Sequence, residues 1–178
     1  GPVALLTLRP DHLRRHAGEV CWPGGRPEPQ DRDLWETACR EASEELGLSV
    51  TARLGRLTAI PVFGSDFRLT PFVARVADGP LRPDPNEVAG VLRAPLRELL
   101  TRPSLEAIPY TLGDEKRLAP IFDLETETGA RRVLYGASAI VLLELLVVVA
   151  RALGVDVPPR VPGHRSWEDA FVGDYRAR

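Results

Sequence analysis

The stretch WPGGRPEPQDRDLWETACREASEELGL, Trp22 to Leu48, joins a Pro-Gly-Gly turn to a segment with an unusual concentration of charge. Glu41, Glu44 and Glu45 crowd together directly after Arg40. Successive residues of an α-helix turn by about 100°, so a helix would place the three carboxylates on one stripe. Like charges at this spacing destabilise a helix by roughly a few tenths of a kcal/mol. Something in the folded protein should therefore compensate for their repulsion.

The sequence also predicts where this helix begins and ends. Asp33 is a typical N-cap residue, and Glu36 three residues later completes the pattern of a capping box. Gly47 is expected to end the helix, because glycine readily adopts the left-handed conformation found there. Apolar residues recur at four-residue steps and predict the buried stripe: Leu34, Ala38, Ala42 and Leu46.

A divalent cation would relieve the repulsion between the carboxylates. Mg²⁺ prefers oxygen ligands and keeps some of its water, so a few carboxylates, a backbone carbonyl and a substrate phosphate make a suitable shell. An acidic helix face exposed to solvent is the alternative explanation. In either case Arg40 can form an ion pair with Glu44, one turn further along the helix.

The string REASEELGL, Arg40 to Leu48, resembles the REUXEEXGU core of the Nudix box, in which U is an apolar residue. The resemblance implies an α/β fold, a Nudix-type α/β/α sandwich with a mixed β-sheet between helices. It also implies hydrolysis of a nucleoside diphosphate linked to another moiety, with Mg²⁺ or Mn²⁺ as cofactor. It assigns metal binding to Glu41, Glu44, Glu45 and the backbone of Gly25, and a catalytic role to Arg40, Glu44 and Glu45.

The upstream half of the box departs from the family pattern. The usual GX5EX7RE spacing would place its Gly at Arg26 and its Glu at Arg32. Gly25 instead stands one residue earlier, and Asp31 and Asp33 flank the place of the Glu. A loop that is one residue longer explains this difference. The family's Glu braces the loop, and the sequence leaves open which residue does so here.

A second motif precedes the box. LLTLRPDHLRRHAGEVCWPGG, Leu5 to Gly25, resembles the signature of the coenzyme A pyrophosphatase branch of the Nudix family, although Pro10 and Trp22 depart from it. The matching positions are Leu5, Leu6, Thr7, Arg9, Arg14, Gly18, Pro23, Gly24 and Gly25.

This second resemblance implies that the substrate is coenzyme A or a derivative. Arg9 and Arg14 are then expected to contact its phosphates, because a guanidinium binds phosphate with two parallel hydrogen bonds. Gly24 is expected to let the backbone approach the ligand, because it has no Cβ. The alternative for both arginines is an ion pair with acidic residues of the box.

A further acidic residue lies downstream. NEVAGVLRAPLREL, Asn86 to Leu99, resembles a recurrent family segment in which an acid precedes a strand and a Pro-Leu turn. Glu87 is therefore the candidate for a late-loop catalytic acid, acting as the base or as an additional metal ligand. An exposed acid at the start of a strand is the plain alternative.

The remaining pattern predicts one domain over residues 1–156 and a Pro-rich tail over 157–178. We expect a short helix near Pro95 to Leu100 and a long one over Gly136 to Leu153, apolar nearly all round and therefore buried. Strands are expected over Val3–Leu8, Glu19–Trp22, Ala52–Val62, Phe67–Val76, Glu87–Arg93, Pro120–Leu124 and Arg131–Tyr135.

Composition narrows the function further. The net charge of −2 provides no field that would favour nucleic acid or an acidic membrane, so a small-molecule substrate is expected. Cys21 and Cys39 are isolated thiols, which favour a reducing compartment and a cytoplasmic location. The chain has no Met and opens within a strand-like run, so we expect its native N-terminus to lie upstream. A homodimer is left open.

Two other functions compete with coenzyme A hydrolysis. The first is a Nudix hydrolase of another nucleoside diphosphate, such as ADP-ribose or NADH, and the upstream signature argues against it. The second is a non-catalytic Nudix-fold module that binds a nucleotide. Such modules usually lack one or more box carboxylates, whereas this chain has all three. Catalysis is therefore the favoured interpretation.

Overall fold

The computed structural model describes residues 1–13, 16–62 and 66–170. The helices within them are α1 (Leu34–Leu46), α2 (Leu96–Leu100), α3 (Gly136–Leu153) and α4 (Trp167–Ala170). The strands are β1 (Val3–Leu8), β2 (Val20–Cys21), β3 (Val50–Arg56), β4 (Ile60–Pro61), β5 (Arg68–Leu69), β6 (Phe72–Val76), β7 (Gly90–Pro95), β8 (Leu105–Leu112), β9 (Glu115–Pro120), β10 (Phe122–Glu125), β11 (Arg131–Leu134) and β12 (Arg160–Pro162).

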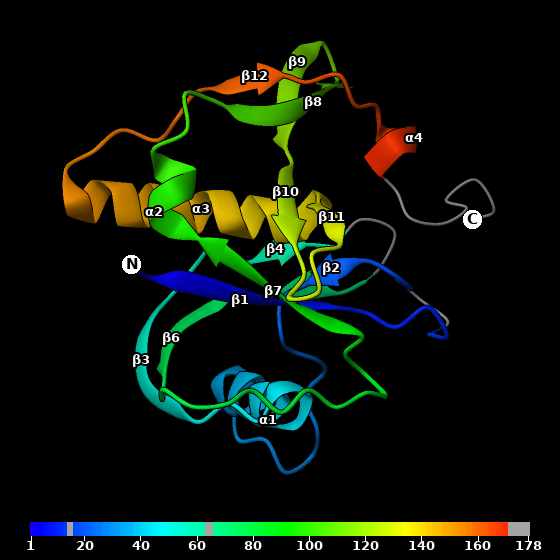
Figure 1. Cartoon of the computed structure of the whole chain (residues 1–178), viewed down its shortest axis with the longest axis vertical. Helices are drawn as coiled ribbons and strands as arrows, with labels where there is room; N and C mark the ends of the chain where they lie inside the picture. The colour runs from blue at the N-terminus through cyan, green and yellow to red at the C-terminus, as the bar shows by residue number, and fades with distance from the viewer. Residues whose placement is uncertain (14–15, 63–65, 171–178) are drawn as a thin grey trace.

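Strand β1 occupies the centre of the structure. It pairs antiparallel with β2 and, along its whole length, with β7. A bridge between Leu92 and Thr126 joins β7 to the β10–β11 hairpin. Helix α3 lies on one side of β1 and β7 and helix α1 on the other (Figure 1). The predicted sandwich of strands between helices is therefore present. Its central strands pair antiparallel, and the parallel pair that makes the strand pairing of the fold mixed, β12 with β8, belongs to a separate three-stranded sheet.

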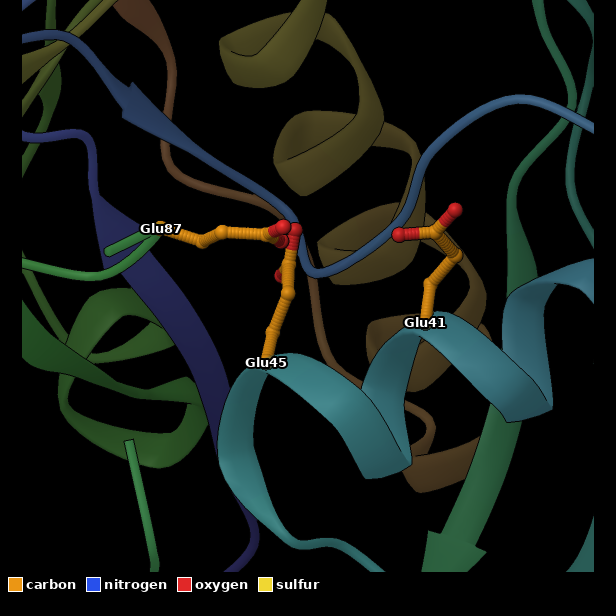
Figure 2. A group of neighbouring side chains, drawn as sticks. All are labelled: Glu41, Glu45 and Glu87. Carbon is orange, nitrogen blue, oxygen red and sulfur yellow. The ribbon is translucent and has the colours of Figure 1, made fainter. Parts of the chain in front are cut away.

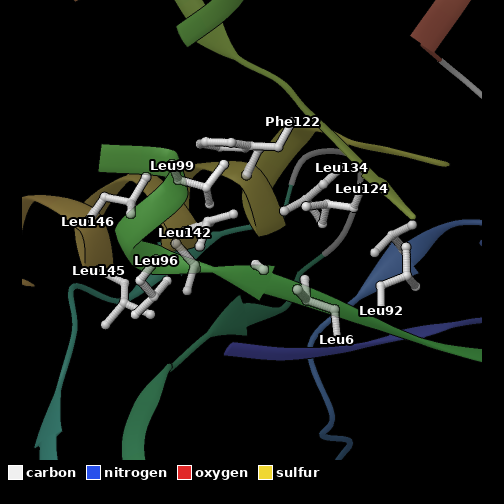
Figure 3. Close-up of a cluster of buried hydrophobic side chains, with 14 of the residues drawn as sticks. Leu6, Leu92, Leu96, Leu99, Phe122, Leu124, Leu134, Leu142, Leu145 and Leu146 are labelled. Carbon is white, nitrogen blue, oxygen red and sulfur yellow. The ribbon is translucent and has the colours of Figure 1, made fainter. Parts of the chain in front are cut away.

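The main core fills the space between α3 and the central strands (Figure 3). Leu6 of β1 and Leu92 of β7 are fully buried, as is Leu142 of α3. The short helix α2 adds Leu99 to the same cluster. These contacts hold β1 and β7 in place. The loop after β1 and the turn before β7 carry residues of the candidate site.

The structure adds a long hairpin that the sequence pattern did not predict. Strands β8 and β9 pair antiparallel from Ala107–Pro120 to Leu112–Glu115. Pro109 lies within β8 and lowers the strand propensity of the segment, because proline cannot donate a backbone hydrogen bond. Within the segment predicted as a tail, β12 adds a parallel strand to β8. A strand that forms only through such long-range pairing is hard to predict from the sequence of the segment itself.

Helix α3 has the predicted bounds, but the prediction that it is buried all round was wrong. Its inner face is buried: Ala139, Val141, Leu142, Leu145, Leu146 and Ala150. Its outer face exposes Ile140, Val147 and Val148. Among the described residues it is also the one helix that is long and apolar enough to cross a membrane, by length and composition only.

Substitutions on the two faces of α3 should differ in their effect on the free energy of unfolding. Leu142→Ala should lower the free energy of unfolding by about 2–5 kcal/mol, because it leaves a cavity in the main core. Leu153→Ala, at a side chain that is 60% exposed on the same helix, should change it by less than about 0.5 kcal/mol. Urea denaturation of both variants measures the difference. Equal costs would contradict the packing described for α3.

Candidate metal centre

The ends of helix α1 form as predicted, with one difference. Asp33 accepts a hydrogen bond from the backbone N–H of Glu36 at 2.9 Å, which makes it the N-cap. Gly47 ends the helix with φ 67°. The Glu36 carboxylate accepts from the backbone N–H of Arg32 at 2.8 Å and not from that of the N-cap. The capping box is therefore half formed, and its return bond lies one residue upstream.

Helix α1 turns part of its acidic face towards the protein interior. Leu34, at the start of the predicted apolar stripe, is 46% exposed. The buried residues of the helix are Thr37, Glu45 and Leu46, and Glu45 is only 5% exposed. A buried carboxylate carries a desolvation cost unless it is paired or binds a cation. This burial distinguishes the cluster from an ordinary solvated acidic face.

Three carboxylates converge at this point. One oxygen from each of Glu41, Glu45 and Glu87 lies within 4.8 Å of the others (Figure 2). The two helix residues are one turn apart, and Glu87 reaches them from the turn before β7. The structure thus brings the late-loop acid to the box, as its candidate role requires.

Backbone hydrogen bonds connect the turn that carries Glu87 to helix α1. The N–H of Asp84 donates to the carbonyl of Glu45 at 2.9 Å. The N–H of Glu87 in turn donates to the carbonyl of Asp84 at 3.0 Å. No sequence motif indicated a role for Asp84. Its backbone fixes the position of Glu87 relative to the helix.

The site disfavours negative charge. The pKa of Glu45 is raised to about 7, mainly by burial and to a smaller extent by the negative charge of Glu41. Burial also raises the pKa of Glu41. Oxygen Oε2 of Glu45 is buried and has no hydrogen-bond partner in the described structure. Converging oxygens, one of them unpaired, suit a hard divalent cation, so the donor set fits the predicted metal.

The glycine turn lies directly against these carboxylates. A Cβ on Gly25 would overlap the carboxyl group of Glu41, so a side chain at this position would displace that carboxylate from the cluster. Gly24 has φ 149°, which L-residues rarely adopt, and a hydrogen bond from its backbone lowers the pKa of Glu45. The turn is anchored by Trp22, whose Nε1 donates to the carbonyl of Ser138 in α3 at 3.1 Å.

Arg40 connects the loop to the helix. Its Nε and Nη2 donate to the two carboxylate oxygens of Asp31 at 3.1 and 3.0 Å. Its Nη1 donates to Glu41 at 3.1 Å and to Glu44 at 2.8 Å. The Arg40 guanidinium holds the pKa of Asp31 well below its usual range. Arg40 thus positions Glu41.

Asp31 braces the loop before helix α1, a role that the sequence motifs did not assign to a residue. Besides Arg40, it accepts from the hydroxyl of Thr37 at 2.9 Å and from the backbone N–H of Glu28 at 2.9 Å. Gly25 and Asp31 keep the usual family spacing, so the extra residue of the loop falls between Asp31 and Arg40. The loop therefore absorbs an insertion without losing its brace.

The other predicted residues are placed less centrally. The side chain of Glu44 is 57% exposed, pairs with the same Arg40 nitrogen as Glu41 and is not a member of the three-carboxylate cluster. Arg9 forms no ion pair with a box carboxylate within the described residues, and its Nε is buried without a hydrogen-bond partner. Its charge lowers the pKa of Glu45, so it lies near the cluster. Arg14 lies outside the described residues.

Comparison with known families agrees with this geometry. The family model described as NUDIX domain matches residues 1–113, and the chain therefore belongs to the Nudix family. Its α/β architecture is the Nudix fold.

Two curated relatives, both named "Uncharacterized Nudix hydrolase NudL", match part of the chain. The protein from Yersinia enterocolitica serotype O:8 / biotype 1B is 46% identical over 102 residues, 56% of this chain and 52% of the relative. That from Yersinia pestis (strain Pestoides F) is 45% identical over 103 residues, 56% and 51% of the two chains. The chain thus spans about half the length of the curated relatives it matches.

Among solved structures, the MutT protein from Methanosarcina mazei Go1 aligns with 24% identity and a TM-score of 0.41. The alignment covers 55% of this chain and 70% of the other.

The raised pKa of Glu45 predicts how stability depends on pH. The pKa of Glu45 in the folded protein, about 7, exceeds the ordinary value of 4.5. The contribution of this group to the free energy of unfolding is therefore fully present below pH 4.5 and is lost as the pH rises through 7. Glu45→Gln removes the titration. Between pH 5 and 8 in EDTA, the wild type should therefore lose on the order of 2 kcal/mol of unfolding free energy relative to the variant.

Urea denaturation of both proteins at the two pH values measures this difference. Mg²⁺ added at pH 8 should restore the wild type and leave Glu45→Gln nearly unchanged. Parallel pH dependence of the two proteins would contradict the buried, charge-poor setting of Glu45.

Proposed function

We propose that this protein hydrolyses the pyrophosphate of a nucleoside diphosphate derivative with the help of Mg²⁺ or Mn²⁺. The observation that carries the proposal is the convergence of Glu41, Glu45 and Glu87. An oxygen of Glu45 is buried there without a partner in the described structure, beside a glycine turn where a Cβ on Gly25 would displace the Glu41 carboxylate. Membership of the Nudix family supports the same reaction.

Glu41, Glu45 and Glu87 would hold the cation. When bound, it neutralises charge on the phosphates and lowers the pKa of a coordinated water. The chain's own residues supply the remaining functions. Glu87 is the most exposed member of the cluster, and its role is either that of an additional ligand or that of the base that accepts a proton from the attacking water. Arg40 keeps Glu41 oriented, and the open space beside Gly24 would admit a phosphate.

For the substrate we propose coenzyme A or its derivatives, cleaved to 3′,5′-ADP and 4′-phosphopantetheine or its acylated form. The signature over Leu5–Gly25 supports this choice. A cleft of about 380 Å³ gives room for a ligand beside Val88, the neighbour of Glu87. Arg9 and Arg132 line it, but Asp11 and Glu127 balance their charge, so the support for phosphate binding comes from the motif. Arg9 is then a phosphate contact, and Arg14 keeps its proposed role from the motif alone.

The proposal predicts different consequences for two neighbouring glutamates. With coenzyme A and Mn²⁺, Glu45→Gln should lower kcat/KM by roughly a hundredfold or more, because even indirect supports of metal ligands cost about 10–100-fold. Glu44→Gln should cost less than about tenfold, because it removes only an exposed pair with Arg40. Mass spectrometry of the products, with circular dichroism as a control for folding, measures both effects.

Parallel assays with ADP-ribose and NADH distinguish the alternatives. Cleavage of these substrates and not of coenzyme A would retain the hydrolase and reject the coenzyme A assignment. Binding of nucleotides without cleavage, in the presence of either metal, would favour a non-catalytic module. Equal losses in the two variants would contradict the separate positions of Glu44 and Glu45.

A further inference from the structure

The outer face of α3 carries an exposed apolar stripe, and Thr58 contacts its one acidic residue, Glu144. Ile140 is 43% exposed, Val147 39% and Val148 49%. Val155, just beyond the helix end, is 50% exposed. At about 100° per residue, the three helical positions lie within one sector of about 100°, opposite the buried face. Exposed apolar side chains gathered on one helix face are typical of a contact surface.

Two opposite charges lie in the middle of this stripe. Viewed down the helix axis, Glu144 and Arg151 project between Val147 and Val148. Glu144 lies towards the N-terminal end of the helix and Arg151 towards the C-terminal end. They are seven residues apart, about 10 Å along the axis, which is too far for them to pair within the helix. Within the described part of the chain neither forms an ion pair. Each charge therefore lacks a counter-charge on a surface that is otherwise apolar.

The carboxylate of Glu144 is held in place. It accepts from the backbone N–H of Thr58 at 2.9 Å and from the Thr58 hydroxyl at 2.8 Å. Both donors are neutral, so they orient the carboxylate without compensating its charge. One half of the stripe thus carries a fixed negative charge, and the other half carries an exposed positive charge. Two copies of this surface in antiparallel orientation would bring opposite charges together.

The symmetry of the stripe defines its partner. Glu144 and Arg151 are equidistant from the midpoint between Val147 and Val148, and so are Ile140 and Val155. A two-fold axis at that midpoint would place two copies of α3 antiparallel. Glu144 of each copy would then lie opposite Arg151 of the other, with the valines at the centre. Such self-complementarity is what a two-fold contact between identical chains requires.

We infer that α3 is a homodimer interface, in which two copies pack antiparallel about Val147 and Val148. The inference is independent of the proposed enzymatic function, because helix α1, which carries Glu41 and Glu45, lies across the central strands from α3 (Figure 1). The stripe is narrow compared with a standard interface, so the dimer is expected to dissociate at about micromolar concentration. The partner is a second copy of this chain.

Sedimentation velocity of the chain over a range of concentrations tests the inference. The wild type should form a dimer, and Val148→Glu should raise its dissociation constant by at least about thirtyfold, the effect of losing a central contact. Leu112→Glu is the matched control, since it adds the same charge at a 56% exposed leucine near the tip of the β8–β9 hairpin. It should change the dissociation constant by less than about twofold.

Disulfide trapping, with Cys21 and Cys39 replaced by Ser, tests the orientation. Val148→Cys should cross-link to itself, because the two positions meet near the axis. Glu144→Cys and Arg151→Cys should cross-link only when mixed, because like positions are offset by about 10 Å, beyond the reach of a disulfide. A wild type that stays monomeric up to about 1 mM, an unaffected Val148→Glu dimer, or Glu144→Cys cross-linked to itself would each overturn the inference.

Discussion

The structure of the site depends on one electrostatic constraint, the burial of Glu45 beside two other carboxylates. Burial and the charge of Glu41 raise the pKa of Glu45 to about 7, and one of its oxygens has no partner in the described structure. Such an arrangement costs folding free energy unless a cation is available to it. The neighbouring features follow from this need. Arg40 balances Glu41, and the glycine turn brings backbone, without side chains, against the acidic face. The site is thus prepared for positive charge from outside the chain.

The scaffold holds this arrangement from three directions. Helix α1 presents Glu41 and Glu45, the turn before β7 presents Glu87, and a backbone bond between Asp84 and Glu45 joins the two segments. From the far side of the sheet, α3 anchors the glycine turn through Trp22. A core shared by β1, β7 and α3 therefore sets the distances between groups that are far apart in sequence (Figure 3). This rigid support is what a preorganised ligand site requires.

The sequence predicted the parts of this account that depend on local pattern. The caps of α1, the bounds of α3 and the strand Val3–Leu8 follow from residues within one or two turns of each other. The motif resemblances further pointed to Glu41, Glu45 and Glu87 before their proximity was known. Long-range features gave no comparable signal. The pairing of β8 with β12 and the exposed face of α3 each depend on segments that meet only in the fold. Asp31 contacts residues near it in sequence, but its bracing role depends on side-chain directions that no motif indicated. Hydrophobicity alone indicated burial of α3 and could not show that only one of its faces is covered.

The most direct test of the central claim is a crystal structure of the protein grown with Mn²⁺, with anomalous diffraction measured to locate the ion. The account predicts one anomalous peak bonded to carboxylate oxygens of Glu41, Glu45 and Glu87, at distances of about 2.0–2.3 Å. Glu44 should remain with Arg40 in the same crystals. Absence of manganese between the three carboxylates at saturating Mn²⁺, or an ion bound through Glu44 with Glu45 left unliganded, would contradict it.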